Sequence, residues 1–178
     1  VGAQRGTAQL YCDHIHPTLN TLSTDWIRTV KSTAPFARIH WTRTCETEVV
    51  TLDSLIHEYG IPDFCKIDVE GYELEVLKGL SVPLPALSVE YLPSAIEEAF
   101  RCIERLQDLG TYEFKLSARE TMRLRWKQWQ PSEIIYRGLQ TLTLNSSAGD
   151  IYARLISKAA PQPGPDSTLA QSHAGGSK

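Results

Sequence analysis

The chain has 178 residues, which is enough for one domain of ordinary size with a hydrophobic core. Hydrophobic residues make up 42% of the sequence and charged residues 22%, a balance that excludes a collagen-like or low-complexity chain. The formal net charge of −3 gives no overall attraction to nucleic acid, and no apolar stretch is long enough for a membrane span.

The cysteines and the two ends of the chain add further expectations. The four cysteines form no CxxC pair and no zinc-binding spacing, which favours a reduced, cytoplasmic setting. Val1 does not begin a signal peptide, and we expect further sequence upstream of it. Residues 159–178 are rich in Pro, Gly and Ser and are expected to be a disordered tail, which leaves 1–158 as the folded unit.

Hydrophobic periodicity predicts alternating strands and helices along the folded unit. Strands are expected at 6–13, 37–50 (as one or two), 64–69, 86–92, 112–116 and 150–156. Helices are expected at about 24–32, 51–59, 73–80, 94–109 and from 131 onward. Ser94 is expected to cap the long fourth helix, and Gly110 to end it.

This order of elements is typical of an α/β fold with right-handed crossovers between parallel central strands. The last two strands have little helix between them, which favours an antiparallel C-terminal edge.

Charged residues in the segment Lys66–Gly71 (KIDVEG) mark the candidate site. Lys66, Asp68 and Glu70 alternate, so they should share one face at the carboxyl end of a strand, where open α/β sheets bind ligands. Glu90 ends the next predicted strand in the same way, and Gly71 allows a tight turn. We therefore expect three carboxylates and a lysine to converge on one crevice.

Each of these residues also has a purely structural interpretation. Glu70 can cap the helix that follows it, where a carboxylate meets free N–H groups. Lys66 can pair with Asp68 or Glu90 and so neutralise a partly buried group. The residues alone leave both interpretations open.

The same region resembles a known family. Residues 51–80 (TLDSLIHEYGIPDFCKIDVEGYELEVLKGL), followed by LSVEYLP at 87–93, closely resemble the FkbM-type methyltransferases. The resemblance implies a partial Rossmann-like methyltransferase sheet and S-adenosylmethionine as the methyl donor. It also implies O-methylation of a hydroxyl on a small-molecule or glycan acceptor, such as a sugar, a glycolipid or a secondary metabolite.

Members of that family carry a Gly-rich turn and an acidic strand end for the donor upstream of this region, and neither occurs here. We therefore expect residues 1–158 to be the C-terminal part of a methyltransferase domain that is inactive and binds the donor weakly by itself. The alternative is a non-catalytic interaction module, or a remnant that has lost the donor pocket. The sequence does not predict the oligomeric state.

The resemblance also assigns roles to the candidate residues. The family resemblance places Asp68 at the strand position nearest the donor methyl, so Asp68 is the candidate to orient the acceptor or to take its proton. Asp68 and Gly71 are both expected to bind the donor. Glu70 and Glu90 are the other catalytic candidates. Three nearby carboxylates can raise each other's pKa or hold a divalent metal ion, and the resemblance leaves that choice open.

Overall fold

The structure is a computed structural model, and it describes residues 1–119, 121 and 123–158. The predicted tail at 159–178 lies outside the described residues. The strands are β1 (Gly6–Cys12), β2 (Arg43–Val49), β3 (Cys65–Ile67), β4 (Ala86–Tyr91), β5 (Gly110–Ala118) and β6 (Gly149–Lys158). The helices are α1 (Thr24–Lys31), α2 (Leu52–Tyr59), α3 (Glu73–Lys78), α4 (Ile96–Leu109) and α5 (Ser132–Gln140).

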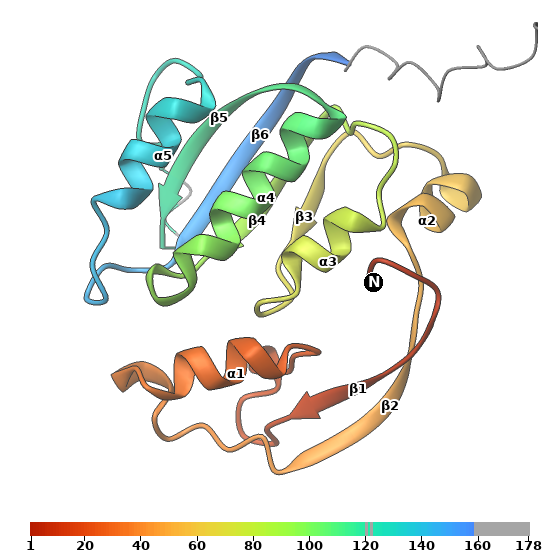
Figure 1. The fold of residues 1–178 in the computed structure, drawn as a ribbon, viewed down its shortest axis with the longest axis vertical. Coiled ribbons are helices and arrows are strands. Elements are labelled where there is room, and N and C mark those ends of the chain that lie inside the picture. The colour runs from red at the N-terminus through yellow and green to blue at the C-terminus, as the bar shows by residue number, and fades with distance from the viewer. Residues whose placement is uncertain (120, 122, 159–178) are drawn as a thin grey trace, which may run out of the picture.

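A four-stranded sheet with the order β3-β4-β6-β5 forms the centre of the molecule (Figure 1). β3 and β4 are parallel, whereas β6 is antiparallel to both of its neighbours. The sequence predicts a mixed α/β fold with antiparallel strands at the C-terminal side, and this is confirmed. The prediction that parallel strands fill the centre is wrong, because β6 inserts between β4 and β5, where Ile151 and Ala153 are fully buried.

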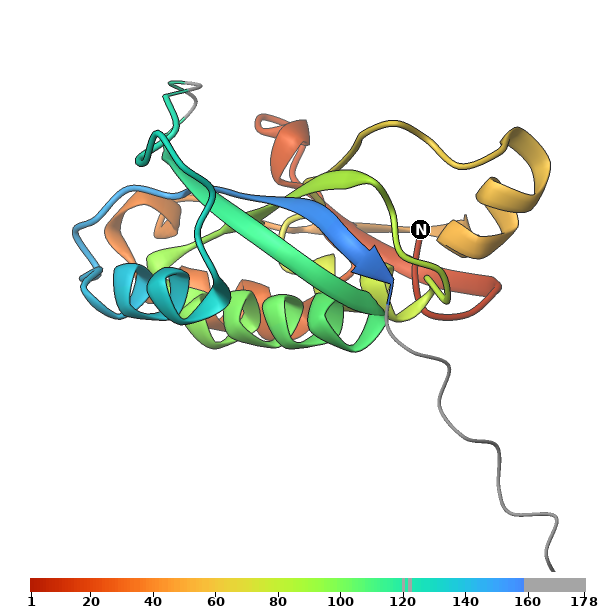
Figure 2. The same cartoon turned by 90° about the horizontal axis from the view of Figure 1, so that it is seen from above.

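The helices α3, α4 and α5 lie together in front of this sheet in Figure 1, and Figure 2 shows α4 and α5 along one of its faces. α4 has the predicted apolar stripe, which buries Ala99, Cys102, Ile103, Leu106 and Leu109. Ser94 does not cap this helix, because it lies within a short 3₁₀ helix, Pro93–Ala95, and α4 starts at Ile96 without a side-chain cap. Pro93 favours that extra turn because its ring fixes φ near the helical value.

β1 and β2 form a separate antiparallel hairpin, with α1 in the connection between them (Figure 1). Ser23 caps α1 by accepting a hydrogen bond from the amide of Trp26. The predicted strand at 37–50 is shorter than expected, because only Arg43–Val49 pairs with β1. The main-chain groups of Tyr11 and Thr21 also pair, so the end of β1 holds the segment that leads into α1.

The carboxylate of Asp13 organises the loop after β1. It accepts hydrogen bonds from the amides of Ile15 and His16 at 2.8 Å and from the amide of His40 at 3.0 Å. The hydrogen bond from the His16 amide is the main cause that lowers the pKa of Asp13, to about 2. One side chain therefore ties this loop to the segment that leads into β2.

β3 is an edge strand of the four-stranded sheet, since β4 is its only partner within the described residues. Beside it, Phe64 is 48% exposed and stacks on Tyr152 of β6 with 6.3 Å between the ring centroids. Within the part of the chain that the structure describes, no helix has both the length and the apolar character needed to cross a membrane.

Candidate functional site

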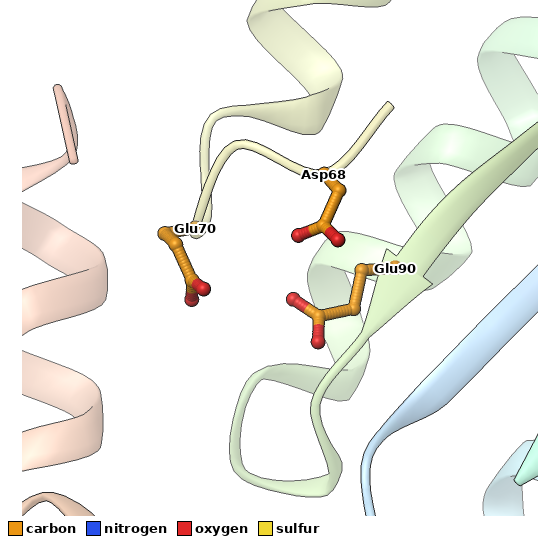
Figure 3. Close-up of side chains that lie close together, drawn as sticks. All are labelled: Asp68, Glu70 and Glu90. Carbon is orange, nitrogen blue, oxygen red and sulfur yellow. The ribbon is translucent and has the colours of Figure 1, made fainter. Parts of the chain in front are cut away.

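Three carboxylates meet where the parallel strands β3 and β4 end side by side (Figure 3). Ile67 is aligned with Val89, so Asp68 and Glu90 follow at the same edge of the sheet. Glu70 reaches the same place from the turn after β3 (Figure 3). One carboxylate oxygen from each of Asp68, Glu70 and Glu90 lies within 4.8 Å of the others. The convergence expected from the alternation of charges is therefore present.

The turn that carries Glu70 differs from a regular continuation of the strand. β3 ends at Ile67, and both Glu70 (φ 54°) and Gly71 (φ 82°) have positive φ values. The hydroxyl of Thr21 donates a 2.6 Å hydrogen bond to the carbonyl oxygen of Glu70. This contact joins the segment before α1 to the turn, and helps to hold Glu70 in a conformation that non-glycine residues seldom adopt.

Glu73 holds the turn between β3 and α3 in place. α3 begins at Glu73, and the carboxylate of Glu73 accepts hydrogen bonds from the amides of Val69 at 3.0 Å and Gly71 at 3.3 Å. Burial is the main cause that raises the pKa of Glu73, which is only 4% exposed. No side-chain hydrogen bond caps α3, so the capping interpretation of Glu70 is wrong, and the Glu70 side chain turns toward Asp68 and Glu90 (Figure 3).

Lys66 links the carboxylate cluster to β6. Its Nζ lies 3.1 Å from Oδ2 of Asp68 and 3.1 Å from Oδ1 of Asp150. Burial lowers the pKa of Lys66, but the hydrogen bonds that Lys66 donates to Asp150 and Asp68 outweigh that effect and raise it. The sequence offered Asp68 or Glu90 as the ion-pair partner of Lys66. The pairing with Asp68 is confirmed, whereas the second partner is Asp150 and not Glu90.

Two of the three carboxylates have strongly shifted protonation equilibria. Burial is the main cause that raises the pKa of Glu90 to about 8, and the charges of Glu70 and Asp68 add to it. Burial and the charge of Asp68 raise the pKa of Glu70 to about 7. Glu70 and Glu90 therefore titrate near neutral pH, where an ordinary glutamate is fully ionised.

The cluster lies at an open surface. A cavity of about 560 Å³ between α1, α3 and α4 includes Gly71 and Tyr72 in its lining, and a smaller one of about 20 Å³ includes Gly71 and Glu90. Asp68 lines neither of these cavities, and its side chain is 39% exposed. A ligand can therefore reach Asp68 directly, while Glu90 is partly shielded.

This arrangement supports two kinds of chemistry. A carboxylate with a raised pKa can accept a proton from a bound hydroxyl at neutral pH. Carboxylate oxygens that lie close together are also the ligands that Mg²⁺ and Ca²⁺ prefer, so the same three residues could hold a divalent cation.

Residues 1–114 match the family described as the methyltransferase FkbM domain. The chain belongs to the FkbM methyltransferase family. The matched region contains the whole of the carboxylate cluster, which confirms the resemblance found in the sequence. No curated protein and no solved structure matches the chain.

Asp150 lies in β6, outside the region that matches the FkbM methyltransferase family. It is the site neighbour that the sequence analysis missed. The only signal in the sequence is that an acidic residue begins the last predicted strand. That signal does not place Asp150 at the site unless β6 is known to pair with β4, where Asp150 is aligned with Glu90.

Proposed function

We propose that this chain is part of an S-adenosylmethionine-dependent O-methyltransferase whose acceptor is a hydroxyl on a sugar, a glycolipid or a secondary metabolite. One observation carries the proposal: in a member of a methyltransferase family, three carboxylates converge at the carboxyl ends of two adjacent parallel strands. Ligands of open α/β sheets bind at this kind of edge.

The charges of the cluster fit the proposed donor. S-adenosylmethionine supplies the methyl group from a sulfonium, which carries a positive charge, and the cluster places acidic side chains close together on an accessible surface. Asp68 and Gly71 are the residues that would contact the donor, because Asp68 is exposed at the strand end and Gly71 lies in the same turn and lines the larger cavity.

We assign different roles to the three carboxylates. Asp68 is exposed and is held by Lys66, so it is suited to accept a hydrogen bond from the acceptor hydroxyl and orient it. Glu90 is partly buried, and its pKa of about 8 makes its carboxylate a stronger base than an ordinary glutamate. Glu90 therefore takes the hydroxyl proton, and the charge of Glu70 helps to keep the pKa of Glu90 high.

The experiment is methyl transfer by the protein expressed from its complete reading frame. The purified protein is incubated with methyl-labelled S-adenosylmethionine and a panel of methyl glycosides, glycolipids and polyketide alcohols, and both S-adenosylhomocysteine and labelled ether are measured. We expect both products with at least one acceptor class. Parallel reactions with EDTA and with added Mg²⁺ separate a metal-dependent reaction from one that uses the carboxylates alone.

If the protein neither binds S-adenosylmethionine nor produces S-adenosylhomocysteine with any acceptor, the proposal fails. The non-catalytic interaction module then becomes the better description. If S-adenosylhomocysteine forms but the label is found on nitrogen or carbon, methyltransferase activity stands and the O-methylation assignment is wrong.

A further inference from the structure

Two cysteines lie next to each other on the hairpin, away from the carboxylate cluster. Leu10 is aligned with Cys45, and Cys12 with Arg43, so Cys12 and Cys45 are diagonal neighbours on one face of β1 and β2. Their Sγ atoms are 3.9 Å apart, and both thiols are free. To reach the ~2.0 Å of a disulfide bond, the two side chains must rotate and the ends of the two strands must draw slightly closer.

The surroundings of the two thiols differ. Cys45 is exposed, whereas Cys12 is half-buried and its thiol donates to the carbonyl oxygen of Leu10 at 3.6 Å. Burial is the main cause that raises the pKa of Cys12, and the neighbouring Cys45 adds to it. Cys45 is therefore the thiol that an oxidant reaches first. Cys12 is the resolving thiol, which can then attack the oxidised Cys45.

The other two cysteines have no such arrangement. Cys102 is 1% exposed in the core beneath α4, so an oxidant cannot reach it in the folded protein. Cys65 is half-buried in β3, in the other sheet of the molecule, and burial raises its pKa. These two residues provide internal comparisons for the hairpin pair.

We propose that Cys12 and Cys45 form a redox-active dithiol, which a small-molecule disulfide of the glutathione class converts to an intramolecular disulfide. The Cys45 thiolate attacks one sulfur of the oxidised compound, whose S–S bond breaks and releases one thiolate. The Cys12 thiolate then attacks Sγ of Cys45, the mixed disulfide breaks, and a second thiolate leaves. The protein loses two electrons and two protons, and the two released small-molecule thiols gain them.

The position of the pair gives the modification a structural effect. Cys12 directly precedes Asp13, whose carboxylate holds the loop after β1. A disulfide at Cys12 and Cys45 would link the two strands of the hairpin directly beside this loop, and would restrict fraying of the strand ends.

The experiment uses the 178-residue chain incubated at a series of reduced-to-oxidised glutathione ratios. Samples are quenched in acid, free thiols are alkylated, and peptides are mapped by mass spectrometry. Wild type, Cys12→Ser, Cys45→Ser and the control Cys65→Ser are compared, with circular dichroism to check that each variant is folded.

We expect a reversible cross-linked peptide pair containing Cys12 and Cys45 in wild type and in Cys65→Ser. Without the resolving thiol, Cys12→Ser should accumulate glutathione on Cys45 at a level about tenfold above that of wild type. Cys45→Ser should leave Cys12 mostly unmodified. The proposal is overturned if wild type carries glutathione on Cys45 without the cross-link, or if both thiols stay free while Cys65 reacts. It is also overturned if the link joins two different chains.

Discussion

The side chain of Trp26 occupies the space that a β-carbon on Gly71 would need. Trp26 is almost fully buried, and its ring also meets the rings of Phe36 and Trp41 edge-on, with centroids 5.5 and 5.7 Å away. Gly71 follows Glu70 in the turn after β3, so this contact positions α1 against the turn that presents one of the three carboxylates.

Replacement of Gly71 by alanine should therefore destabilise the protein more than its backbone conformation alone would predict. Gly60 is the matched control, because its φ of 89° is similar to the 82° of Gly71 and no atom lies within 4 Å of its added β-carbon. We expect Gly60→Ala to cost about 1 kcal/mol and Gly71→Ala about 3 kcal/mol in urea unfolding. Equal losses for the two variants would contradict the steric argument.

Lys66 neutralises the buried carboxylate of Asp150, which is 8% exposed. Lys66→Met should lower the free energy of unfolding by about 2 kcal/mol, because it leaves a buried charge without its partner. The double variant Lys66→Met/Asp150→Asn should recover most of that loss in a double-mutant cycle. Arg28→Gln, which breaks the exposed Arg28–Asp25 pair, serves as the control and should change stability by less than about 0.5 kcal/mol.

The raised pKa of Glu90 predicts that the protein loses stability as the pH rises. The folded state holds this proton up to about pH 8, whereas the unfolded state releases it near 4.5. The stabilising contribution of the protonated group is therefore complete below pH 4.5 and disappears as the pH rises through about 8. Glu70 acts in the same direction up to about pH 7.

Glu90→Gln tests this dependence, because glutamine cannot ionise. We expect the variant to match wild type in urea unfolding at pH 5 and to be more stable by about 2 kcal/mol at pH 9. Glu97→Gln, on the exposed side of α4, should follow the wild-type curve at both pH values. A wild-type stability that rises between pH 5 and pH 9, with no difference in Glu90→Gln, would show that Glu90 ionises normally.

Asp68→Asn tests the assigned role in orienting the acceptor. Turnover in the methyl-transfer assay should fall by a factor of about 100 or more, whereas donor affinity in calorimetry should fall much less. The control is Asp63→Asn, which changes an exposed aspartate just before β3. Retention of wild-type turnover by Asp68→Asn would remove Asp68 from the mechanism and leave Glu70 and Glu90 as the candidates.

The exposed edge beside β3 predicts self-association. β3 has a free side within the described residues, and Phe64 next to it is 48% exposed. Phe64→Lys should reduce the aggregated fraction of the 178-residue chain in light scattering. Tyr59→Lys changes a more exposed aromatic residue at the end of α2, away from the sheet edge, and should have a smaller effect. The reverse order would exclude the edge as the cause.

Local sequence signals predicted the elements that local interactions determine. α2 follows from Thr51, whose side chain completes a capping box with Ser54, and from Gly60, which ends the helix. α4 follows from apolar residues that repeat at the helical period over 14 residues. The charges of the segment Lys66–Gly71 correctly indicated where the carboxylates converge.

The missed features depend on contacts between distant parts of the chain. The hydrogen bond from Lys66 to Asp150 joins residues 84 positions apart, and it forms only because β6 lies beside β4. The contact between Trp26 and Gly71 requires α1 to pack on the turn after β3, which no periodic pattern encodes. The hydrogen bonds of Glu73 were missed because they depend on the turn with positive φ values at Glu70 and Gly71, which folds back onto the start of α3.

The three amide hydrogen bonds to Asp13 affect how the whole molecule should respond to acid. With a pKa of about 2, Asp13 stays ionised at pH 4, whereas Glu70 and Glu90 are already neutral there. Mild acid should therefore discharge these two glutamates without releasing the loop that precedes α1. A spectroscopic change seen between pH 4 and pH 9 therefore does not arise from ionisation of the Asp13 carboxylate.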